Sequence, residues 1–211
     1  MNKARENIFR KIRDALATTT PLPFKQADGT VSEIYRMSED ELSVSFAQRF
    51  TELQGKFSYC VDKAAFLHQF KALLQAQNLS KVYCIEQELC DELGLINFGA
   101  DLEELSKCDV SVTSCECLVA RTGSIILSAA QESGRNTSVY APIHICVAYT
   151  SQVVEDIKNG IELLHKKYTK ELPSLITLAT GPSRTADIEK TLVVGVHGPK
   201  EVYVFLIEDS I

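Results

Sequence analysis

Short apolar runs alternate with segments of helical periodicity through most of this sequence. The apolar runs lie at 57–61, 82–85, 109–113, 124–128, 144–149, 174–180 and 202–207. Between them, apolar residues recur every three or four positions, as with Phe66 and Phe70 or Ile157 and Ile161. Parallel strands need helical crossovers and are buried on both faces, so the alternation predicts an α/β fold with a mainly parallel sheet covered on both faces. The runs 124–128 and 144–149 have no helix between them, which predicts an antiparallel pair.

Three polar residues are expected to begin helices. Ser38 with Glu41 forms a capping-box pattern before a helix that stops at Gly55, and Asp62 precedes the helix that carries Phe66. Thr113 with Glu116 repeats the pattern, which predicts a short helix that ends at Gly123.

The N-terminal part is predicted to be an arm. Ile8, Ile12 and Leu16 recur at steps of four among charged residues, which indicates an amphipathic helix over 3–17. Residues 18–32 hold two prolines and a glycine and are typical of a linker. We therefore divide the chain into an arm with its linker, 1–32, and an α/β domain, 33–211. The helix packs on its own domain or on a partner, while acidic residues within it argue against a mitochondrial presequence.

Charge and hydropathy exclude several classes of protein. The 211 residues include 22 Lys and Arg against 28 Asp and Glu, a net charge of −6. This leaves no basic surplus for binding nucleic acid through its phosphates. No apolar run approaches the roughly 18 residues of a membrane span, and the N-terminus lacks the apolar stretch of a signal peptide. The sequence predicts a soluble, cytoplasmic protein without a transmembrane segment.

The seven cysteines form neither a CxxC motif nor the paired spacing of a disulfide framework or zinc site. Most stand inside apolar runs, so we expect small buried residues in a reducing compartment and no metal site. Cys115 and Cys117 alone are close in sequence, and two thiolates are too few for an iron–sulfur cluster. Cys115 at a helix N-terminus would be a candidate nucleophile, although Glu116 beside it opposes a lowered thiol pKa.

The loop 181–189 is the first candidate site. Gly181 lets the backbone approach a ligand, Ser183 and Thr185 supply hydroxyls, and Arg184 offers a bidentate fork, ahead of a predicted helix start. Together they predict a cradle for a phosphate or carboxylate, with a spacing that matches neither the Walker A loop nor GxGxxG. The alternative is an ordinary strand-to-helix turn with capping residues and a favourable dipole.

Three further residues are candidates. His197 in the turn 196–199 is accessible for acid–base chemistry, or else is a hydrogen-bonded turn residue. His144 begins a strand and is either part of a site or a satisfied core residue. Arg135 lies in the loop before it, as a ligand contact or a surface residue.

Several stretches together resemble the LUD-domain proteins of lactate utilisation, of the LutC/YkgG type. They are ARENIFRKIRDAL at 4–16, Thr113, ARTGSIIL at 120–127, Arg135, PIHI at 142–145 and GPSRTADIEKTLVVGVHGP at 181–199. The resemblance spans nearly the whole chain and rests above all on the last stretch. It implies a fold similar to the NagB/RpiA/CoA-transferase group, a three-layer α/β/α sandwich, which agrees with the alternation of strands and helices.

The resemblance also implies a role in oxidising L-lactate to pyruvate. The chain would be an accessory subunit beside LutA-type and LutB-type partners, and the iron–sulfur clusters would lie in those partners rather than in this chain. One residue departs from the family pattern: Arg121 stands where members commonly carry glutamate. If that glutamate handled a ligand or proton, this chain has lost it or uses Glu116 instead.

Two functions follow from these patterns. The first is the accessory subunit, which binds a small anion or a partner through the 181–189 loop. The second is an independent enzyme of the phosphosugar isomerase or CoA-transferase-like type acting on a small anionic substrate. Catalytic residues and oligomeric state stay open. The candidate ligand-binding residues are Gly181, Pro182, Ser183, Arg184, Thr185, Asp187, Glu189, Thr113, Glu116, Thr122, Gly123, Arg135, His144 and His197.

Overall fold

The computed structural model describes residues 3–17, 41–97, 99–186, 192–195 and 197–209. Contacts divide the chain into two units, 1–37 and 38–211. In the first, the helix α1 spans Lys3–Ala17, so the predicted N-terminal helix is present. The predicted division at 32/33 and the Ser38 cap lie outside the described residues. Helix α2 begins after Glu41 instead.

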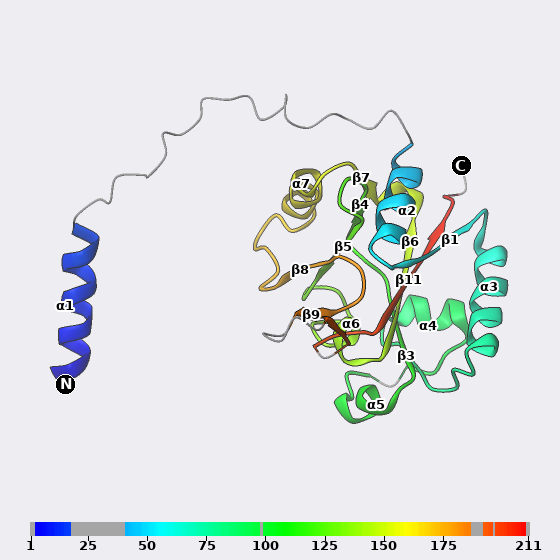
Figure 1. Cartoon of the computed structure of the whole chain (residues 1–211), viewed down its shortest axis with the longest axis horizontal. Helices are drawn as coiled ribbons and strands as arrows, with labels where there is room; N and C mark the ends of the chain where they lie inside the picture. The colour runs from blue at the N-terminus through cyan, green and yellow to red at the C-terminus, as the bar shows by residue number, and fades with distance from the viewer. Residues whose placement is uncertain (1–2, 18–40, 98, 187–191, 196, 210–211) are drawn as a thin grey trace. The chain divides into compact units, whose positions relative to one another are not determined.

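The second unit alternates strands and helices, as Figure 1 shows. Its helices are α2 (Leu42–Glu52), α3 (Lys63–Ala76), α4 (Gln87–Leu93), α5 (Leu102–Lys107), α6 (Thr137–Tyr140) and α7 (Ile157–Lys167), with a 3₁₀ turn at Thr150–Gln152. Its strands are β1 (Lys56–Cys60), β2 (Val82–Tyr83), β3 (Val110–Thr113), β4 (Cys117–Val119), β5 (Ser124–Ser128), β6 (Ile143–Tyr149), β7 (Val153–Val154), β8 (Ile176–Ala179), β9 (Arg184–Ala186), β10 (Leu192–Val194) and β11 (Glu201–Ile207).

Among the described residues, the strands form three groups. The main sheet has the order β1-β11-β6-β3-β2, the second sheet has the order β7-β4-β5-β8, and β9 and β10 form a hairpin. Every pairing in the main sheet is parallel. In the second sheet, β5 is antiparallel to both β4 and β8. The predicted α/β class with a mainly parallel sheet is confirmed.

Helices α3 and α4 cover one face of the main sheet. Asp62 begins α3 as predicted, because its carboxylate accepts a hydrogen bond from the Ala65 amide at 2.6 Å. The spacing of Phe66 and Phe70 then directs both rings onto this face, where Phe66 meets Phe205 of β11 edge to face. The buried apolar side chains of β3, β6 and β11 complete this core.

The other face of the main sheet packs on α2 and on the second sheet. Phe46 and Phe50 of α2, Leu118 and Ile125 of the second sheet, and Val204 of β11 are buried together. The outer face of the second sheet is covered by α7 through Leu164 (Figure 1). The second sheet is thus an additional layer between the main sheet and α7.

Two local predictions are wrong. β5 and β6 do not pair with each other, because β5 lies in the second sheet and β6 in the main sheet. Residues 113–116 do not cap a helix, because 117–119 form strand β4. The capping pattern fails there since Glu116 has a different set of hydrogen-bond partners, described below. Within the described part of the chain, no helix combines the length and apolar character needed to cross a membrane.

Candidate functional site

The carboxyl ends of β2, β3, β6 and β11 meet at one edge of the main sheet, where open α/β sheets bind ligands. A cleft of about 630 Å³ lies there, and we call it the carboxyl-edge cleft. The residues that end these strands or follow them and line the cleft include Glu86, Ser114, Tyr149, Ser151, Gln152 and Asp209. Lys167 and Tyr168 at the end of α7 form another part of its wall.

Glu116 lies beneath this cleft with its side chain fully buried. One carboxylate oxygen accepts hydrogen bonds from the Tyr168 hydroxyl at 2.7 Å and the Ser128 hydroxyl at 2.5 Å. The other oxygen accepts one from the Lys167 ammonium at 2.7 Å. Both oxygens of the carboxylate are therefore satisfied by side chains from β5 and from the end of α7.

These contacts set the pKa values of the pair. Burial by itself raises the pKa of Glu116, but the hydrogen bonds from Lys167, Ser128 and Tyr168 outweigh it and hold that pKa below its ordinary value. For Lys167, burial lowers the pKa, and the hydrogen bond with Glu116 more than reverses this. Both groups are charged near neutral pH, so the pair is a structural ion pair rather than a poised acid and base.

Backbone groups organise the rest of the carboxyl-edge cleft. Both oxygens of the Glu86 carboxylate lie 3.1 Å from the Ser114 amide, which donates to them. Gln152 donates to the Cys115 carbonyl at 2.8 Å. The Asp209 carboxylate accepts from the Ser151 amide, which lowers the pKa of Asp209. These bonds hold the loops after β3, β6 and β11 against one another.

The carboxyl-edge cleft is strongly acidic. Its charged lining residues are Glu86, Glu88, Glu92, Glu132, Asp209 and Lys167. Lys167 is already paired with Glu116, so the described lining offers little positive potential to a free carboxylate or phosphate. A small anionic ligand is therefore disfavoured at this edge.

The described start of the 181–189 loop, residues 181–184, lies at the opposite, amino edge of the main sheet. Gly181 packs on the Leu53 carbonyl, where α2 ends just before β1 begins. The reason is the strand that precedes the loop. Because β8 belongs to the second sheet and runs antiparallel to β5, its carboxyl end reaches the amino edge of the main sheet.

The predicted helix start after Ser183 is wrong. Residues 184–186 form β9, which pairs with β10. The Ser183 amide donates to the Pro199 carbonyl at 2.9 Å, and the Ser183 carbonyl accepts from the Gly195 amide at 3.0 Å. The paired strands β9 and β10 therefore lie between residues, Ser183 and Pro199, whose backbones are hydrogen-bonded together. Asp187 and Glu189 lie outside the described residues.

Arg184 is exposed, and its guanidinium donates to the Leu53 carbonyl at the end of α2. Gly181 has a φ of +76°, and a Cβ there would lie 2.7 Å from the same carbonyl oxygen. Pro182 is buried, while Ser183 is half-buried. Arg184 thus has one structural contact and keeps part of its guanidinium at the surface. Thr185 lies in β9.

Thr122 and Gly123 join this region from the turn between β4 and β5. Ser124 donates to the Thr122 hydroxyl at 2.8 Å and lies 2.8 Å from the Thr180 hydroxyl, next to Gly181. A Cβ on Gly123 would lie 2.7 Å from the Phe50 amide nitrogen of α2. The 120–127 and 181–184 stretches therefore meet at the end of α2.

Thr113 and His144 form a buried pair on neighbouring strands. Thr113 Oγ1 lies 2.9 Å from His144 Nε2, and both residues are almost fully enclosed. Burial lowers the pKa of His144 to about 4, so the ring is neutral near pH 7. His144 is a core residue rather than an accessible base.

His197 and Arg135 occupy separate places. His197 is exposed beside a cavity of about 350 Å³ that Tyr140 and Gly198 also line, ahead of β6 and β11 at the amino edge. Arg135 donates to the Ser174 hydroxyl at 2.7 Å. Of the predicted residues, those of 181–184 with Thr122, Gly123 and His197 share the amino edge, while Glu116 alone lies at the carboxyl-edge cleft.

Arg121, which stands where family members commonly carry glutamate, forms an ion pair with Asp156. Its Nε and Nη2 atoms each lie 2.8 Å from an oxygen of Asp156, the residue that caps α7. The hydrogen bond with Arg121 lowers the pKa of Asp156. At this position the side chain links the β4–β5 turn to the start of α7.

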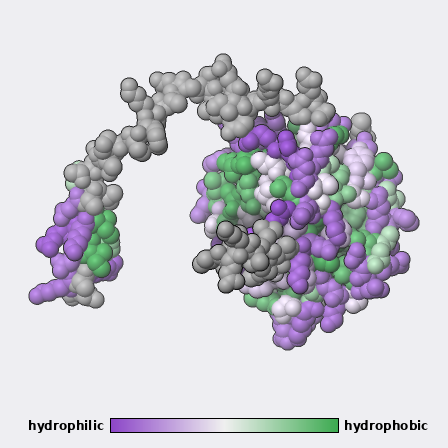
Figure 2. Space-filling model, in the orientation of Figure 1, coloured by the Kyte–Doolittle hydropathy of each residue, from purple (hydrophilic) through white to green (hydrophobic). Residues whose placement is uncertain are grey.

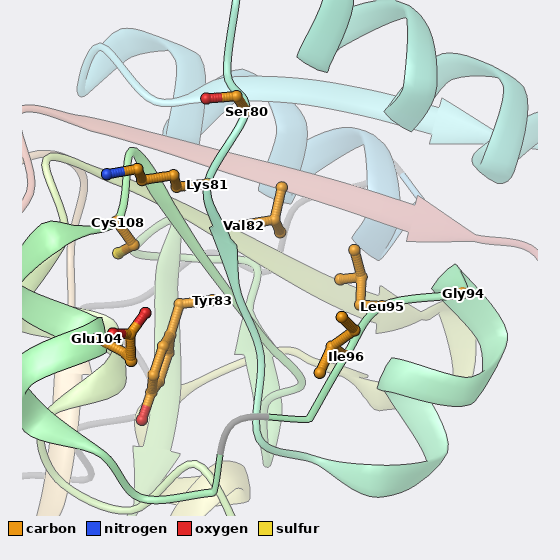
Figure 3. A pocket seen from close by; sticks show the side chains of 9 residues that line it. All are labelled: Ser80, Lys81, Val82, Tyr83, Gly94, Leu95, Ile96, Glu104 and Cys108. Carbon is orange, nitrogen blue, oxygen red and sulfur yellow. The ribbon is translucent and has the colours of Figure 1, made fainter.

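A third cavity, of about 400 Å³, lies along the edge strand β2. Figure 3 shows Tyr83 beside Glu104 on one side of the strand, and Leu95 and Ile96 on the other. The Tyr83 hydroxyl donates to the Gly99 carbonyl at 2.9 Å. Its lining is mostly apolar, and it lacks the converging polar groups of the carboxyl-edge cleft.

All seven cysteines are buried and unbridged, as the sequence predicts. A hydrogen bond with Cys146 and burial raise the pKa of Cys115 well above its ordinary value. Burial raises the pKa of Cys117 to about 12. Both remain protonated thiols at neutral pH, which opposes nucleophilic catalysis by Cys115. Across the described residues, no three His, Cys, Asp or Glu side chains converge as metal ligands.

Several lining residues were not singled out from the sequence, among them Glu86, Gln152, Lys167 and Asp209. Glu86 and Asp209 each follow an apolar run within two residues, so the carboxyl-end rule could have found them. Lys167 and Gln152 carry no such signal, because only the folded arrangement of α7 and the 3₁₀ turn brings them to the cleft.

Comparisons with known proteins agree with this fold. The LUD domain family profile matches residues 99–207. An uncharacterized protein of Neisseria meningitidis is 27% identical over 231 aligned residues, covering 97% of this chain and 93% of that protein. A crystal structure of a DUF162 family protein from Deinococcus radiodurans superposes with a TM-score of 0.62 at 20% identity, over 82% of this chain and 99% of that one, which shows the shared fold.

Two further relatives carry a functional name. Lactate utilization protein C of Deinococcus radiodurans is 34% identical over 105 residues, which are 49% of this chain and 49% of that protein. Lactate utilization protein C of Bacillus subtilis is 30% identical over 111 residues, which are 52% of this chain and 46% of that protein. The match spans about half the length of these two relatives.

Proposed function

Because the chain belongs to the LUD domain family, we propose that it is a LutC-type protein of lactate utilisation. It acts as a cytoplasmic accessory subunit in the oxidation of L-lactate to pyruvate. LutA-type and LutB-type partners carry the iron–sulfur clusters, and this chain carries none. The names of the relatives support the lactate assignment, and the features of the site support a subunit over an independent enzyme.

One observation supports the amino edge of the main sheet as the functional surface. Described residues of three stretches far apart in the sequence, 120–127, 142–145 and 181–199, meet at the amino edge of the main sheet. Ser124 contacts Thr180, the Ser183 amide bonds Pro199, and the Lys200 amide donates to the Pro142 carbonyl at 2.8 Å. These are three of the stretches in which the chain resembles its family, and they include the longest one. Function is therefore assigned to this edge.

Charge favours the same edge for a small anion. Arg184, His197 and Lys200 are exposed there, whereas the carboxyl-edge cleft is lined mainly by carboxylates. The free part of the Arg184 guanidinium supplies the donors that a carboxylate or phosphate needs. We assign the amino edge as the surface that binds a small carboxylate or a partner subunit.

The alternative, a phosphosugar isomerase or CoA-transferase-like enzyme, has less support. It needs an accessible general base or nucleophile within a ligand cavity. Among the described residues, His144 is enclosed, Cys115 stays protonated, and the Glu116 carboxylate is saturated by three donors. Each of these three groups is arranged for structure rather than for turnover, and His197, exposed beside the cavity of about 350 Å³, is the described residue that such an enzyme would have to use as its base.

A thermal-shift titration with lactate, pyruvate and phosphate tests direct anion binding. A ligand that binds the folded chain raises its melting temperature once its concentration exceeds the dissociation constant. Arg184→Ala should abolish the ligand-dependent shift, Arg184→Lys should retain part of it, and Lys158→Ala on the exposed face of α7 should leave it intact. The variants are compared by their ligand-dependent shift and not by their melting temperature without ligand. The reason is that Arg184 also donates to the Leu53 carbonyl at the end of α2, so its loss changes the stability of the unliganded chain. No shift with any anion would exclude the small-anion version.

Co-purification tests the partner version. The tagged chain is co-expressed with LutA-type and LutB-type subunits and isolated under native conditions. Retention of both partners supports the subunit assignment, and failure to retain either contradicts it.

A further inference from the structure

Helix α1 has an exposed apolar stripe that the proposed function does not use. Ile8, Phe9 and Ile12 are 58%, 46% and 47% exposed. Residues four apart share one side of a helix, so the two isoleucines lie in line. Figure 2 shows hydrophobic side chains along one side of α1 and hydrophilic side chains along the other.

The stripe is bordered by positive charge. Within 3–17, five Lys and Arg stand against Glu6 and Asp14. At about 3.6 residues per turn, Lys11 and Arg13 fall on opposite flanks of the stripe. Arg5 lies with its guanidinium carbon 5.4 Å from the Phe9 ring centroid, so its stem follows the apolar side. Long basic side chains on both flanks can reach outward while the stripe is buried.

Basic residues outnumber acidic ones in the N-terminal part of the chain and not in the rest. Residues 1–37 contain seven Lys and Arg against four Asp and Glu, whereas residues 38–211 contain 15 against 24. A surface that attracts α1 must therefore be anionic and must accept an apolar stripe. We propose that α1 binds the surface of an anionic lipid bilayer, with Ile8, Phe9 and Ile12 in the interface and the flanking basic residues at the lipid phosphates.

A bilayer fits these observations better than a groove in a protein. Lys11 and Arg13 lie on the two flanks of the stripe, which suits a planar anionic surface, and a bilayer demands no matching shape. Binding by one short helix is expected to be reversible and to depend on salt. This inference is independent of the lactate assignment, because it concerns only the surface to which α1 binds and not the reaction in which the chain takes part.

The test is flotation of the full chain with vesicles of phosphatidylcholine, with and without phosphatidylglycerol. We expect the fraction bound to anionic vesicles at low salt to exceed that bound to neutral vesicles by about tenfold or more, and to fall as salt rises. Ile8→Ser with Ile12→Ser should abolish binding. Ile96→Ser, which alters an isoleucine 72% exposed on the domain, should not.

A charge series completes the design. Lys11→Glu with Arg13→Glu should abolish binding, whereas Lys158→Glu with Lys166→Glu on α7 should leave most of it. Circular dichroism of each variant establishes that the domain stays folded. Absence of binding to anionic vesicles at low salt overturns the proposal, in favour of a protein groove as the partner of α1. Equal binding to neutral vesicles, or binding retained by the stripe variant, overturns it as well.

Discussion

The Glu116 carboxylate is fully buried, whereas the Lys167 ammonium 2.7 Å from it belongs to a half-exposed side chain. The pair joins the chain between β3 and β4 to the last residue of α7. Removal of the lysine would leave a buried charge with only the Ser128 and Tyr168 hydroxyls as partners. The pair therefore fixes one wall of the carboxyl-edge cleft.

Lys167→Met is expected to lower the free energy of unfolding by about 1–2 kcal/mol, less than for a fully buried pair because the ammonium is partly solvated. Urea denaturation measures this, with Lys166→Met as the matched control. Adding Glu116→Gln to Lys167→Met should recover part of the loss. Equal effects of the two lysine substitutions would show that the ion pair contributes nothing.

His144 makes stability depend on pH between about 6.5 and 4. Its pKa in the folded chain, about 4, is below the unfolded value of 6.5, so the unfolded chain takes up the proton first. The stability it contributes is complete above pH 6.5 and is lost as pH falls toward 4, by at most about 3 kcal/mol. His144→Gln, which keeps a partner for Thr113, should flatten unfolding free energies measured between pH 7 and 5. An unchanged slope would refute this assignment.

Gly181→Ala should destabilise the protein by about 1–3 kcal/mol, because it strains a positive φ and drives a methyl group against the Leu53 carbonyl. Gly94→Ala is the control. Gly94 also has a positive φ, +66°, but open space around its Cβ position, so it should cost only about 1 kcal/mol. Chemical denaturation compares the two, and a smaller loss at Gly181 would contradict the packing described.

The thiols should resist modification in the folded protein. All seven cysteines are buried, and the pKa of Cys115 is raised by Cys146 and by burial. Titration with a thiol-reactive chromogenic disulfide at pH 7.5 should detect almost no fast reaction in buffer and seven thiols in urea. A fast-reacting thiol that disappears in Cys115→Ser would restore the nucleophile hypothesis.

Most of the fold could be predicted because each element carries its own signal. Asp62 before the spacing of Phe66 and Phe70 marks α3, and the continuous apolar run 202–207 marks a strand buried on both faces. The split into two sheets could not be predicted. The runs 124–128 and 174–180 are as apolar as the parallel strands, and only pairing decides which sheet they join.

That split also explains which edge of the main sheet the residues after β8 reach. The rule that ligands bind at the carboxyl ends of strands holds within one parallel sheet, and β8 lies outside it in the opposite direction. The loop that begins at Gly181 therefore lies at the amino edge. The sequence drew attention to Glu116 through the capping pattern with Thr113 and the family departure at Arg121, but its partner Lys167 is 51 residues away, and no local pattern joins them.

The most direct test of the subunit assignment is lactate-dependent reduction of an artificial electron acceptor by purified components. The account predicts turnover when this chain is combined with LutA-type and LutB-type subunits, a large loss when it is omitted, and none from this chain alone. Full activity of the two partners without it would contradict the account, as would turnover of a sugar phosphate or CoA ester by the chain alone.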